Sequence, residues 1–484
     1  MFAAIVRFSF NGAIMDTVSE KLAREEPDLS ARSGANRAQK LVAGFLALAG
    51  VAGVLFGGPL WSTVCAAFGF CMFLAVVLRL QAAVSTCARA ALPAPVLSDA
   101  DLPTYTILIA LYREAAVAPR LVAALAAIDY PVVKLQIIFA LEADDHATQD
   151  ALQAQALPPH ASLLLVPEGK PRTKPRALNY GLLAARGSLL VIFDAEDQPE
   201  PDQLRKGAAA FAAAPSNVAC LQASLSIDNL RDSWLTRLFA LDYSGLFDVF
   251  NPGLARLDVP VPLGGTSNHF RTDILRRIGG WDAWNVTEDA DLGLRLARFG
   301  FSTQVIDSTT WEEAPATLRH WFPQRRRWMK GWMQTLVTHT RQPRRLAREI
   351  GWMRAVLVIA TLGANTLGPL IGPIFMAYVT FDAIAGDLLS PQKSVSQAIA
   401  STCWIMLATT GLVSLILPTA LAMSRRGLWS SAFFLLARPF HWALMSAAAW
   451  SALFDLFRRP FHWAKTEHGI SQNKLRKFHP PKRA

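Results

Sequence analysis

Apolar residues are gathered into long uncharged runs near the two ends of the chain, on either side of a mixed central region. Leu41 to Leu60 and Trp61 to Leu78 contain no charged residue, and each approaches the ~20 residues that a bilayer-spanning helix needs. Gly57-Gly58-Pro59, near their junction, indicates a turn. We therefore expect a transmembrane helical hairpin over residues 40–82, preceded by a cytosolic lead over residues 1–39.

Three further apolar segments follow toward the C-terminus, at residues 354–381, 396–423 and 428–457. We expect residues 351–457 to hold the C-terminal transmembrane segments, with the number of crossings left open. Arg438-Pro439 interrupts the last segment, which is therefore expected to be broken or re-entrant. A basic tail over residues 458–484 is expected to be cytosolic, because cationic flanks favour the cytoplasmic side of a membrane.

The central region, residues 83–315, contains short apolar runs that alternate with amphipathic stretches. The runs indicate strands at Tyr105–Leu111, Leu135–Leu141, Ser162–Val166, Leu189–Phe193 and Val218–Ser226. Strands that alternate with helices predict an α/β, Rossmann-like domain with a parallel sheet covered on both faces. Ligands of such sheets bind beyond the carboxyl ends of the strands, where Asp144-Asp145 and Asp194 are expected to share one rim.

Residues 316–350 join this domain to the C-terminal apolar segments. Ala316 to Arg341 is rich in Trp and Arg at helical spacing, which is too charged for a span and suits a helix at the membrane interface. The composition agrees, since 52% of the 484 residues are hydrophobic and only 18% are charged, as in a membrane protein with one soluble part. The net charge of +11 is strong in the tail, where it favours membrane lipid over nucleic acid as a partner. The five cysteines predict neither a disulfide framework nor a metal site.

The first candidate for chemistry is Asp194-Ala195-Glu196-Asp197, at the end of the fourth predicted strand. Carboxylate oxygens are the hard ligands that Mg²⁺ or Mn²⁺ prefers, and such an ion would neutralise a nucleoside diphosphate. Asp194 is expected to share the ion with either Glu196 or Asp197. The alternative is a solvated acidic turn ahead of a helix that begins near Pro201.

The second candidate is Thr287-Glu288-Asp289, which precedes an apolar-periodic run and indicates the start of a helix. In the functional interpretation Asp289 is a general base that removes a proton from an acceptor hydroxyl. In the structural alternative Thr287 caps the helix, and the two acids are there because negative charge is favourable at a helix N-terminus.

The third candidate, Gln324-Arg325-Arg326-Arg327-Trp328, combines cations with an indole. Arginine binds phosphate oxygens in a bidentate fork, and an indole face stacks on the CH face of a sugar ring. The alternative is a basic interfacial helix with an aromatic anchor. There are three weaker candidates, each with a structural alternative. Lys174 could simply stand at the start of a helix, Gly264 to Asn268 could be a turn, and Trp463 to Gly469 could be part of the basic tail.

These motifs occur in the order of an acidic pair, strand-end acids, Thr-Glu-Asp and Gln-x-x-Arg-Trp. With this order the chain resembles the membrane-integrated processive family 2 glycosyltransferases: the cellulose, chitin and hyaluronan synthases and their bacterial relatives. The resemblance covers about residues 40–470. It implies a cytosolic GT-A-type catalytic domain embedded in an α-helical transmembrane protein of the bacterial inner membrane. It also implies Mg²⁺- or Mn²⁺-dependent inverting transfer from UDP-glucose or UDP-N-acetylglucosamine to a growing β-linked polysaccharide.

The resemblance also implies a role for each matching residue. Asp289 is the catalytic base, with Glu288 beside it. The donor nucleotide is expected to contact Asp144, Asp145, Lys174, Gln324, Arg327, Trp328 and Thr466. Thr466 belongs, with Trp463 and Lys465, to a segment that is expected to cover the nucleotide. The acceptor is expected to contact Gly265, Thr266, Ser267 and Trp328. The metal is expected at Asp194, Glu196 and Asp197.

Two features of the sequence depart from the family pattern. Glu196 stands where the second aspartate of the metal motif is expected, and His146 follows the acidic pair in place of a glycine. Neither departure removes a carboxylate. Two alternatives to the processive enzyme stay open. The first is a non-processive enzyme that glycosylates a lipid such as a polyprenyl phosphate or diacylglycerol. The second is a non-catalytic membrane transporter or receptor.

Overall fold

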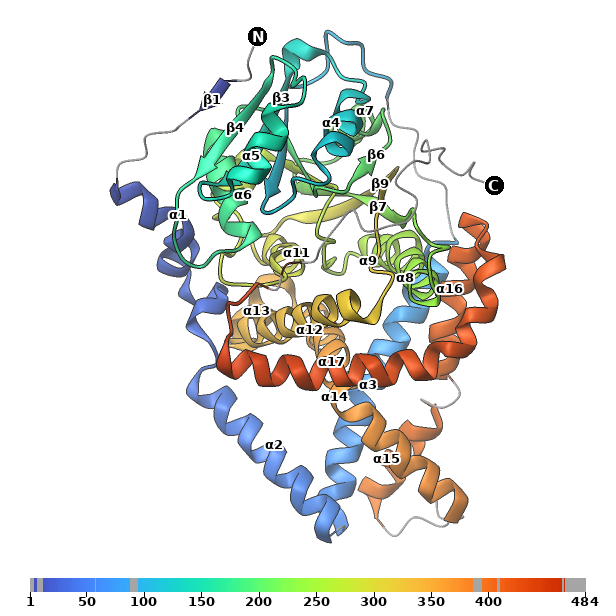
Figure 1. Cartoon of the computed structure of the whole chain (residues 1–484). Coiled ribbons are helices and arrows are strands. Elements are labelled where there is room, and N and C mark those ends of the chain that lie inside the picture. Colours follow the sequence, from blue (N-terminus) through green and yellow to red (C-terminus); the bar gives the residue numbers. More distant parts are fainter. Residues whose placement is uncertain are drawn as a thin grey trace.

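The computed structural model describes residues 4–6, 12–56, 58–87, 95–385, 394–406, 410–463 and 465. An α/β domain occupies the upper part of the molecule, and a group of long helices extends below it (Figure 1). Helices α12 (Leu318–Thr340) and α17 (Arg438–Arg458) lie between these two parts. The division into a domain and a helical part follows the hydrophobic pattern of the sequence.

One mixed sheet forms the centre of the domain. Within the described residues it has nine strands in the order β1-β4-β3-β2-β5-β8-β7-β9-β6. Their bounds are β1 (Ala4–Val6), β2 (Tyr105–Leu111), β3 (Leu135–Glu142), β4 (Ala161–Val166), β5 (Leu189–Phe193), β6 (Gln198–Pro199), β7 (Val218–Ile227), β8 (Asn268–Arg271) and β9 (Ser302–Glu312). The five predicted strands are β2, β3, β4, β5 and β7. The expectation of a parallel sheet holds for β4-β3-β2-β5, but β8 is antiparallel to both of its neighbours.

Both faces of the sheet are covered by helices, because the central strands are continuous apolar runs. On β2, Tyr105, Ile107 and Ile109 belong to the core on one face, whereas Leu108 belongs to the core on the other. The first core is completed by α4 (Ala118–Ala126), α5 (His146–Gln153) and α7 (Gln203–Ala213). The second is completed by α6 (Lys174–Ala184), α10 (Thr272–Arg277) and α11 (Glu288–Arg298).

The helices outside these two layers fall into two groups. Those around the domain are α1 (Gly12–Glu25), η1 (Pro27–Leu29), η2 (Ala31–Ser33), η3 (Val132–Lys134), α8 (Trp234–Gly245), η4 (Leu246–Phe250), α9 (Asn251–Arg256) and α13 (Pro343–Ile350). Those in the predicted membrane regions are α2 (Arg37–Phe56), α3 (Gly58–Ser85), α14 (Trp352–Ala385), α15 (Val395–Met406), α16 (Leu412–Arg426) and η6 (Trp429–Ala437).

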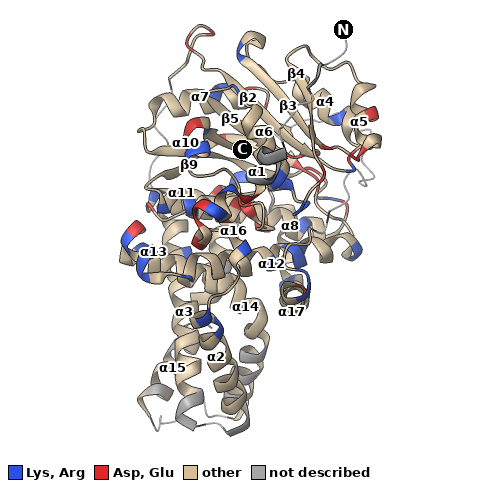
Figure 2. Cartoon of the chain, turned by 90° about the vertical axis from the view of Figure 1, so that its left-hand side faces the viewer, with Lys and Arg blue, Asp and Glu red and all other residues tan. Residues whose placement is uncertain are grey.

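Two of the described helices contain a segment long and apolar enough to cross a membrane. These segments are Ser62–Ser85 in α3 and Trp352–Pro373 in α14. In Figure 2 the charged residues gather on the domain, and α3, α14 and α15 extend away from it.

The last predicted apolar segment does not form one straight helix. It comprises η6 and α17, and α17 lies across the neighbouring helices (Figure 1). The break coincides with Arg438, whose Nη1 lies 3.0 Å from Asp242 Oδ1. Pro439 is accommodated in the first turn of α17, where a missing backbone N–H has no cost. The ion pair thus holds the start of α17 against α8 of the domain.

Candidate active site

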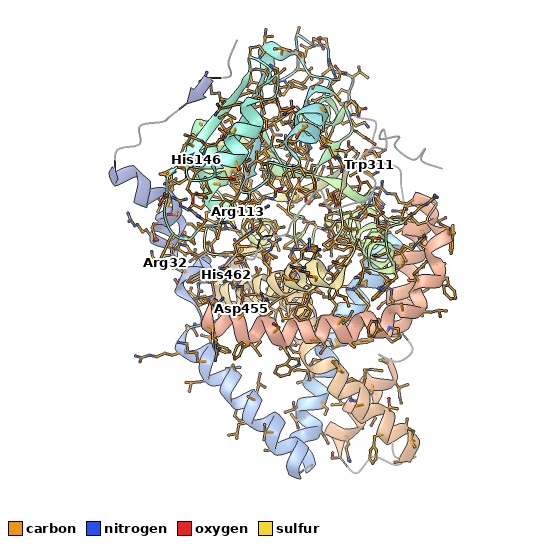
Figure 3. The ribbon with its side chains drawn as sticks, viewed as in Figure 1. Arg32, Arg113, His146, Trp311, Asp455 and His462 are labelled. Carbon is orange, nitrogen blue, oxygen red and sulfur yellow. The ribbon has the colours of Figure 1, made fainter. Side chains whose placement is uncertain are left out.

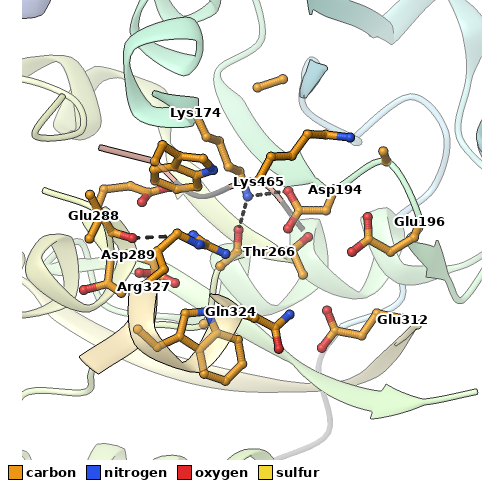
Figure 4. Close-up of a pocket in the computed structure, with 18 of the residues that line it drawn as sticks. Lys174, Asp194, Glu196, Thr266, Glu288, Asp289, Glu312, Gln324, Arg327 and Lys465 are labelled. Atoms are coloured by element: carbon orange, nitrogen blue, oxygen red, sulfur yellow. Dashed lines mark hydrogen bonds and ion pairs between the residues drawn. The ribbon is translucent and has the colours of Figure 1, made fainter. Parts of the chain in front are cut away.

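A pocket opens beyond the carboxyl ends of the central strands (Figure 4). Its wall is formed by the strand ends of β2, β5 and β9, the first turns of α6 and α11, and one face of α12. The residues expected from sequence that line it are Lys174, Asp194, Glu196, Gly265, Thr266, Glu288, Asp289, Gln324, Arg327, Trp328, Trp463 and Lys465. Motifs that are far apart in the chain therefore meet in one cavity.

Gly265 lies between the two key carboxylates of this pocket. A Cβ atom built on Gly265 would be 3.2 Å from Asp289 Oδ2 and 4.0 Å from Asp194 Oδ2. Asp194 reaches this place from the end of β5, and Asp289 from the first turn of α11. The absence of a side chain at residue 265 thus keeps open the space that both carboxylates face.

Lys174 supplies the positive charge nearest to these acids. Its ammonium group donates to a carboxylate oxygen of Asp194 and, at 2.7 Å, to the carbonyl of Gly265. Burial alone would lower the pKa of Lys174, but Asp194, Glu288 and Asp289 outweigh it and raise the pKa. The side chain therefore stays cationic at the centre of the pocket.

Glu288 is buried and Asp289 is partly buried at the start of α11, and desolvation raises the pKa of each. The pKa of Glu288 rises to about 8, with Asp289 as the next cause after burial. Lys174 and Arg327 act in the opposite direction on Asp289, whose Oδ1 also accepts a hydrogen bond of 2.9 Å from the N–H of Ala290. The predicted helix cap is wrong in one respect, because the side chain of Thr287 makes no capping hydrogen bond.

The strand-end acids divide into two that line the pocket and one that supports the turn. Asp194 and Glu196 line the cavity. Asp197 instead accepts hydrogen bonds through Oδ2 from the N–H of Asp194, at 2.7 Å, and from the hydroxyl of Thr266. Its Oδ1 is buried without a hydrogen-bond partner, and burial together with Asp194 and Glu196 raises its pKa well above the usual range.

This donor set fits a divalent cation, because it offers hard oxygen ligands and an excess of negative charge that a cation would relieve. In the described part of the chain, however, no three His, Cys, Asp or Glu side chains form a ready-made ligand group. An ion held by Asp194 and Glu196 would therefore take its remaining ligands from phosphate oxygens and water, as Mg²⁺ commonly does.

Helix α12 presents Gln324, Arg327 and Trp328 on one face, as their helical spacing requires. Arg327 Nη1 donates to the carbonyl of Val286 at 3.5 Å, and its Nε is buried without a partner. Burial lowers the pKa of Arg327, while Glu288 and Asp289 oppose that shift. The ring of Trp328 stacks on Tyr243 at a centroid distance of 6.3 Å and an interplanar angle of 13°.

Lys330, two residues beyond Trp328, holds the turn that follows α17. Its Nζ lies 2.8 Å from Asp455 Oδ2 and donates to the carbonyls of Arg459, at 3.0 Å, and His462, at 2.9 Å. Figure 3 shows Asp455 and His462 close together at the lower edge of the domain. Because Lys330 is 1% exposed, these contacts replace water for a buried ammonium group.

The chain beyond this turn returns to the pocket. Trp463 covers the guanidinium of Arg327 at 4.3 Å, and Lys465 Nζ lies 3.0 Å from Glu114 Oε1. Both residues line the cavity, as the resemblance implied for a segment that covers the nucleotide. Thr466 lies outside the described residues.

Comparison with known proteins agrees with this geometry. Residues 103–331 match the model of the family described as glycosyltransferase like family 2. The matched stretch is slightly less than half of the chain and is similar to that family. The match confirms the predicted enzyme class at the level of this domain, and gives no support to a non-catalytic transporter or receptor.

Three curated relatives of this domain illustrate its range. The probable glycosyltransferase YdaM of Bacillus subtilis is 24% identical over 238 residues, 48% of this chain and 56% of that protein. Glucomannan 4-beta-mannosyltransferase 2 of Arabidopsis thaliana is 32% identical over 145 residues, 29% of this chain and 27% of that protein. Beta-monoglucosyldiacylglycerol synthase of Synechocystis is 25% identical over 282 residues, 56% of each chain. The chain thus spans about half or less of the length of these relatives.

A solved structure shares the fold. The mannosyltransferase PcManGT from Pyrobaculum calidifontis, in complex with GDP-Man and Mn²⁺, superposes with a TM-score of 0.54 and 20% sequence identity. The match covers 82% of this chain and 99% of that chain. The domain therefore has the expected GT-A-like α/β fold.

The acidic pair expected at the donor side does not line the pocket of the domain. Asp145 caps α5 by accepting from the N–H of Thr148 at 3.3 Å, and its other oxygen accepts from the N–H of Arg113 at 2.5 Å. Asp144 is half-exposed and pairs with Arg172 at 2.8 Å. The carboxylate that lines the pocket at this strand end is Glu142, which sequence reasoning missed.

Glu142 is the last residue of β3, one position beyond the predicted end of that strand. Burial raises its pKa to about 7, although Arg176, at 3.6 Å, opposes the shift. Sequence reasoning also missed Tyr112 and Glu114, which follow β2 at the same rim. The rule that ligands bind beyond strand ends could have found all three.

Only part of the predicted acceptor loop lines the pocket. Gly265 and Thr266 line the pocket, but Ser267 is fully buried and donates its hydroxyl hydrogen bond to Thr310 Oγ1 at 2.7 Å. Ser267 therefore sits in the core of the sheet rather than against a ligand, because the backbone turns inward into β8 at this residue.

Proposed function

We propose that this protein is an inverting glycosyltransferase that transfers a hexose from a nucleoside diphosphate sugar to a hydroxyl group of an acceptor. The observation that carries the proposal is the space beside Gly265, which the carboxylates of Asp289 and Asp194 face from two sides. Asp289 lies on one side of this space as the base. Asp194 lies on the other side, where a divalent cation would bind the diphosphate, so the reacting atoms have room between the two carboxylates. This arrangement is what an in-line displacement at a sugar carbon requires.

In the proposed reaction Asp289 takes the proton of the acceptor hydroxyl. The oxygen then attacks the anomeric carbon while the bond from that carbon to the diphosphate oxygen breaks. Lys174 and Arg327 face the place where the negative leaving group develops, so they stabilise it without reorganisation. A divalent cation bound at Asp194 and Glu196 would neutralise further charge on the diphosphate.

The donor is a nucleoside diphosphate sugar, and three donors of this class are candidates. The sequence resemblance favours UDP-glucose and UDP-N-acetylglucosamine. The names of two similar proteins, a glucomannan mannosyltransferase and a mannosyltransferase in complex with GDP-Man, add GDP-mannose. Mn²⁺ in the latter complex supports a divalent cation as cofactor.

We further propose that the domain works on the cytosolic face of a bacterial inner membrane, anchored by α3 and α14. The preferred product is a β-linked polysaccharide whose growth is coupled to export. A second candidate, transfer to a lipid, is favoured by the name of the Synechocystis relative, a diacylglycerol glucoside synthase. The size of the product distinguishes a polymer from a single-sugar glycolipid.

The proposal is tested with the purified full-length chain in detergent or lipid nanodiscs. Each of the three donors is supplied with Mg²⁺, Mn²⁺ or a chelator, and released nucleotide and linked sugar are measured. We expect one donor to be consumed, with loss of transfer in the chelator and a β-linkage in the product. Absence of transfer from every donor, in a protein that is folded and binds lipid, would overturn the proposal.

A further inference from the structure

Asp291 places a second carboxylate in the first turn of α11, on the side away from the pocket. It follows Asp289 by two residues, so the two side chains point about 200° apart around a helix of 3.6 residues per turn. Asp289 lines the pocket, whereas Asp291 does not line it and is fully buried. The first turn of α11 therefore presents the proposed base on one side and a buried charge on the other.

His339, in the last turn of α12, binds this buried carboxylate. Its Nε2 lies 3.0 Å from Asp291 Oδ1, and Arg298 Nη1 donates to its Nδ1 at 3.3 Å. A guanidinium group can only donate, so Nδ1 is an acceptor and the ring proton is on Nε2. Burial lowers the pKa of His339, which favours this neutral form. His339 is therefore a hydrogen-bond donor to Asp291.

Two arginines of α11 complete the anchor around this pair. Arg295 Nε lies 3.3 Å from Asp291 Oδ2, and Arg298 Nε lies 2.6 Å from Glu349 Oε2 on α13. Burial would raise the pKa of Asp291, but the hydrogen bond from His339 and the charge of Arg295 outweigh it and lower the pKa. The ionised carboxylate and the arginines thus hold α11 against α12 and α13, which lie beside it in Figure 1.

The face of α12 that carries His339 also holds the loop ahead of α11. Gln334 Oε1 accepts from the N–H of Val286 at 3.0 Å, and Thr335 Oγ1 accepts from the side-chain amide of Asn285 at 3.0 Å. Nearer the start of α12, this face lines the pocket. One helix therefore sets both a wall of the pocket and the place of the turn that bears the base.

We propose that His339, acting through Asp291, is a positioning residue for the base Asp289. The anchor fixes the rotation of α11 about its axis, and with it the direction from which the carboxylate of Asp289 enters the pocket. This inference rests on the proposed function, in which Asp289 takes the proton of the acceptor hydroxyl. His339 does not line the pocket, so loss of the anchor moves the base without removing a contact to the donor.

The test uses His339→Phe in the full-length chain, which keeps a ring and removes both nitrogens. kcat and the KM for the donor are measured, and binding of UDP and GDP is measured separately by calorimetry. We expect kcat to fall about 10- to 100-fold, the cost of displacing reacting atoms by up to about 1 Å, with the KM and the nucleotide affinity unchanged. His339→Gln, which restores an N–H donor toward Asp291, is expected to recover most of the lost kcat.

His269→Phe is the matched control. His269 is also fully buried, and its Nδ1 lies 2.6 Å from the hydroxyl of Tyr105, but it belongs to β8 and does not line the pocket. We expect this variant to lose stability, measured as a fall in Tm like that of His339→Phe, and to keep its kcat. The comparison separates loss of a buried histidine from displacement of the base.

Asp291→Asn is a milder second variant, in case His339→Phe does not fold. It keeps the shape of the side chain and weakens the same hydrogen bond by removing its charge, so a smaller fall in kcat at an unchanged KM is expected. An unchanged kcat in both variants that fold, a nucleotide affinity that falls as much as kcat, or no recovery in His339→Gln would overturn the inference and leave the proposed function standing. Failure of the unaltered protein to consume any nucleotide sugar would instead refute the proposed function itself.

Discussion

The substitution Gly265→Ala tests whether the space between the two carboxylates is where the reaction takes place. The added methyl group would lie 3.2 Å from Asp289 Oδ2 and 4.0 Å from Asp194 Oδ2, with no other atom closer than 4 Å. A hydroxyl that gives its proton to Asp289 must approach that oxygen to about 2.6–3.2 Å. The methyl group and the hydroxyl therefore compete for the same volume.

The expected effect is large on catalysis and small on stability. Displacement of reacting atoms by about 1 Å costs on the order of 100-fold, which corresponds to about 2.7 kcal/mol of activation free energy. Gly265 does not have a positive φ, so alanine is compatible with its backbone. A compatible Gly-to-Ala change usually stabilises a protein by about 0.4–1 kcal/mol, which offsets the close contact with Asp289.

The assay compares kcat/KM for sugar transfer and the Tm of the variant with those of the unaltered protein. Gly245→Ala is the matched control, because its added methyl would meet only Thr419 Oγ1, at 3.9 Å, outside the pocket. Full activity in Gly265→Ala would refute the placement of the reacting atoms beside residue 265. A strong fall in Tm would show that the loss of activity is a folding effect.

Three further outcomes are expected. Lys330→Met removes the hydrogen bonds that hold the turn after α17, so it should raise the KM for the donor with little change in kcat. Lys330→Arg should keep the KM near that of the unaltered protein. An unchanged KM in Lys330→Met would contradict a role for this turn in donor binding. Trp463→Ala removes a cation–π contact with Arg327 of about 0.5–1 kcal/mol, so calorimetry should show nucleotide binding weakened about two- to fivefold. Lys174→Met removes a positive charge that lowers the pKa of Asp289, so the pKa of Asp289 should rise. Because only the deprotonated base is active, the acidic limb of the pH profile of kcat should move to higher pH. A shift to lower pH would exclude Asp289 as that base.

Much of the fold could be predicted because its central strands are short continuous apolar runs. β2 and β5 are buried on both faces, so their hydrophobicity alone marks them, and Asp194 follows directly after β5. Position at a strand end then places this acid at the ligand-binding rim. The resemblance to a known family gave Asp289 and Arg327, whose local patterns also fit a helix start and an interfacial helix.

Other parts of the site depend on tertiary packing that local patterns do not encode. β9, which ends at Glu312, contains many polar residues and becomes a strand through its parallel pairing with β7. Asp145 satisfies the motif in sequence, but its oxygens are taken by backbone N–H groups of α5 and of the loop after β2. The course of α17 is likewise fixed at a distance, by the ion pairs of Arg438 and of Lys330 with carboxylates from other elements.

The central claim is that Asp289 is the base of a sugar transfer within this pocket. It is tested most directly by the transfer rate of Asp289→Asn, with nucleotide affinity measured on the same preparation and Asp150→Asn, on the exposed surface of α5, as control. The account predicts a fall in transfer of about 10²–10⁴-fold with nucleotide binding retained. A transfer rate equal to that of the unaltered protein would contradict it.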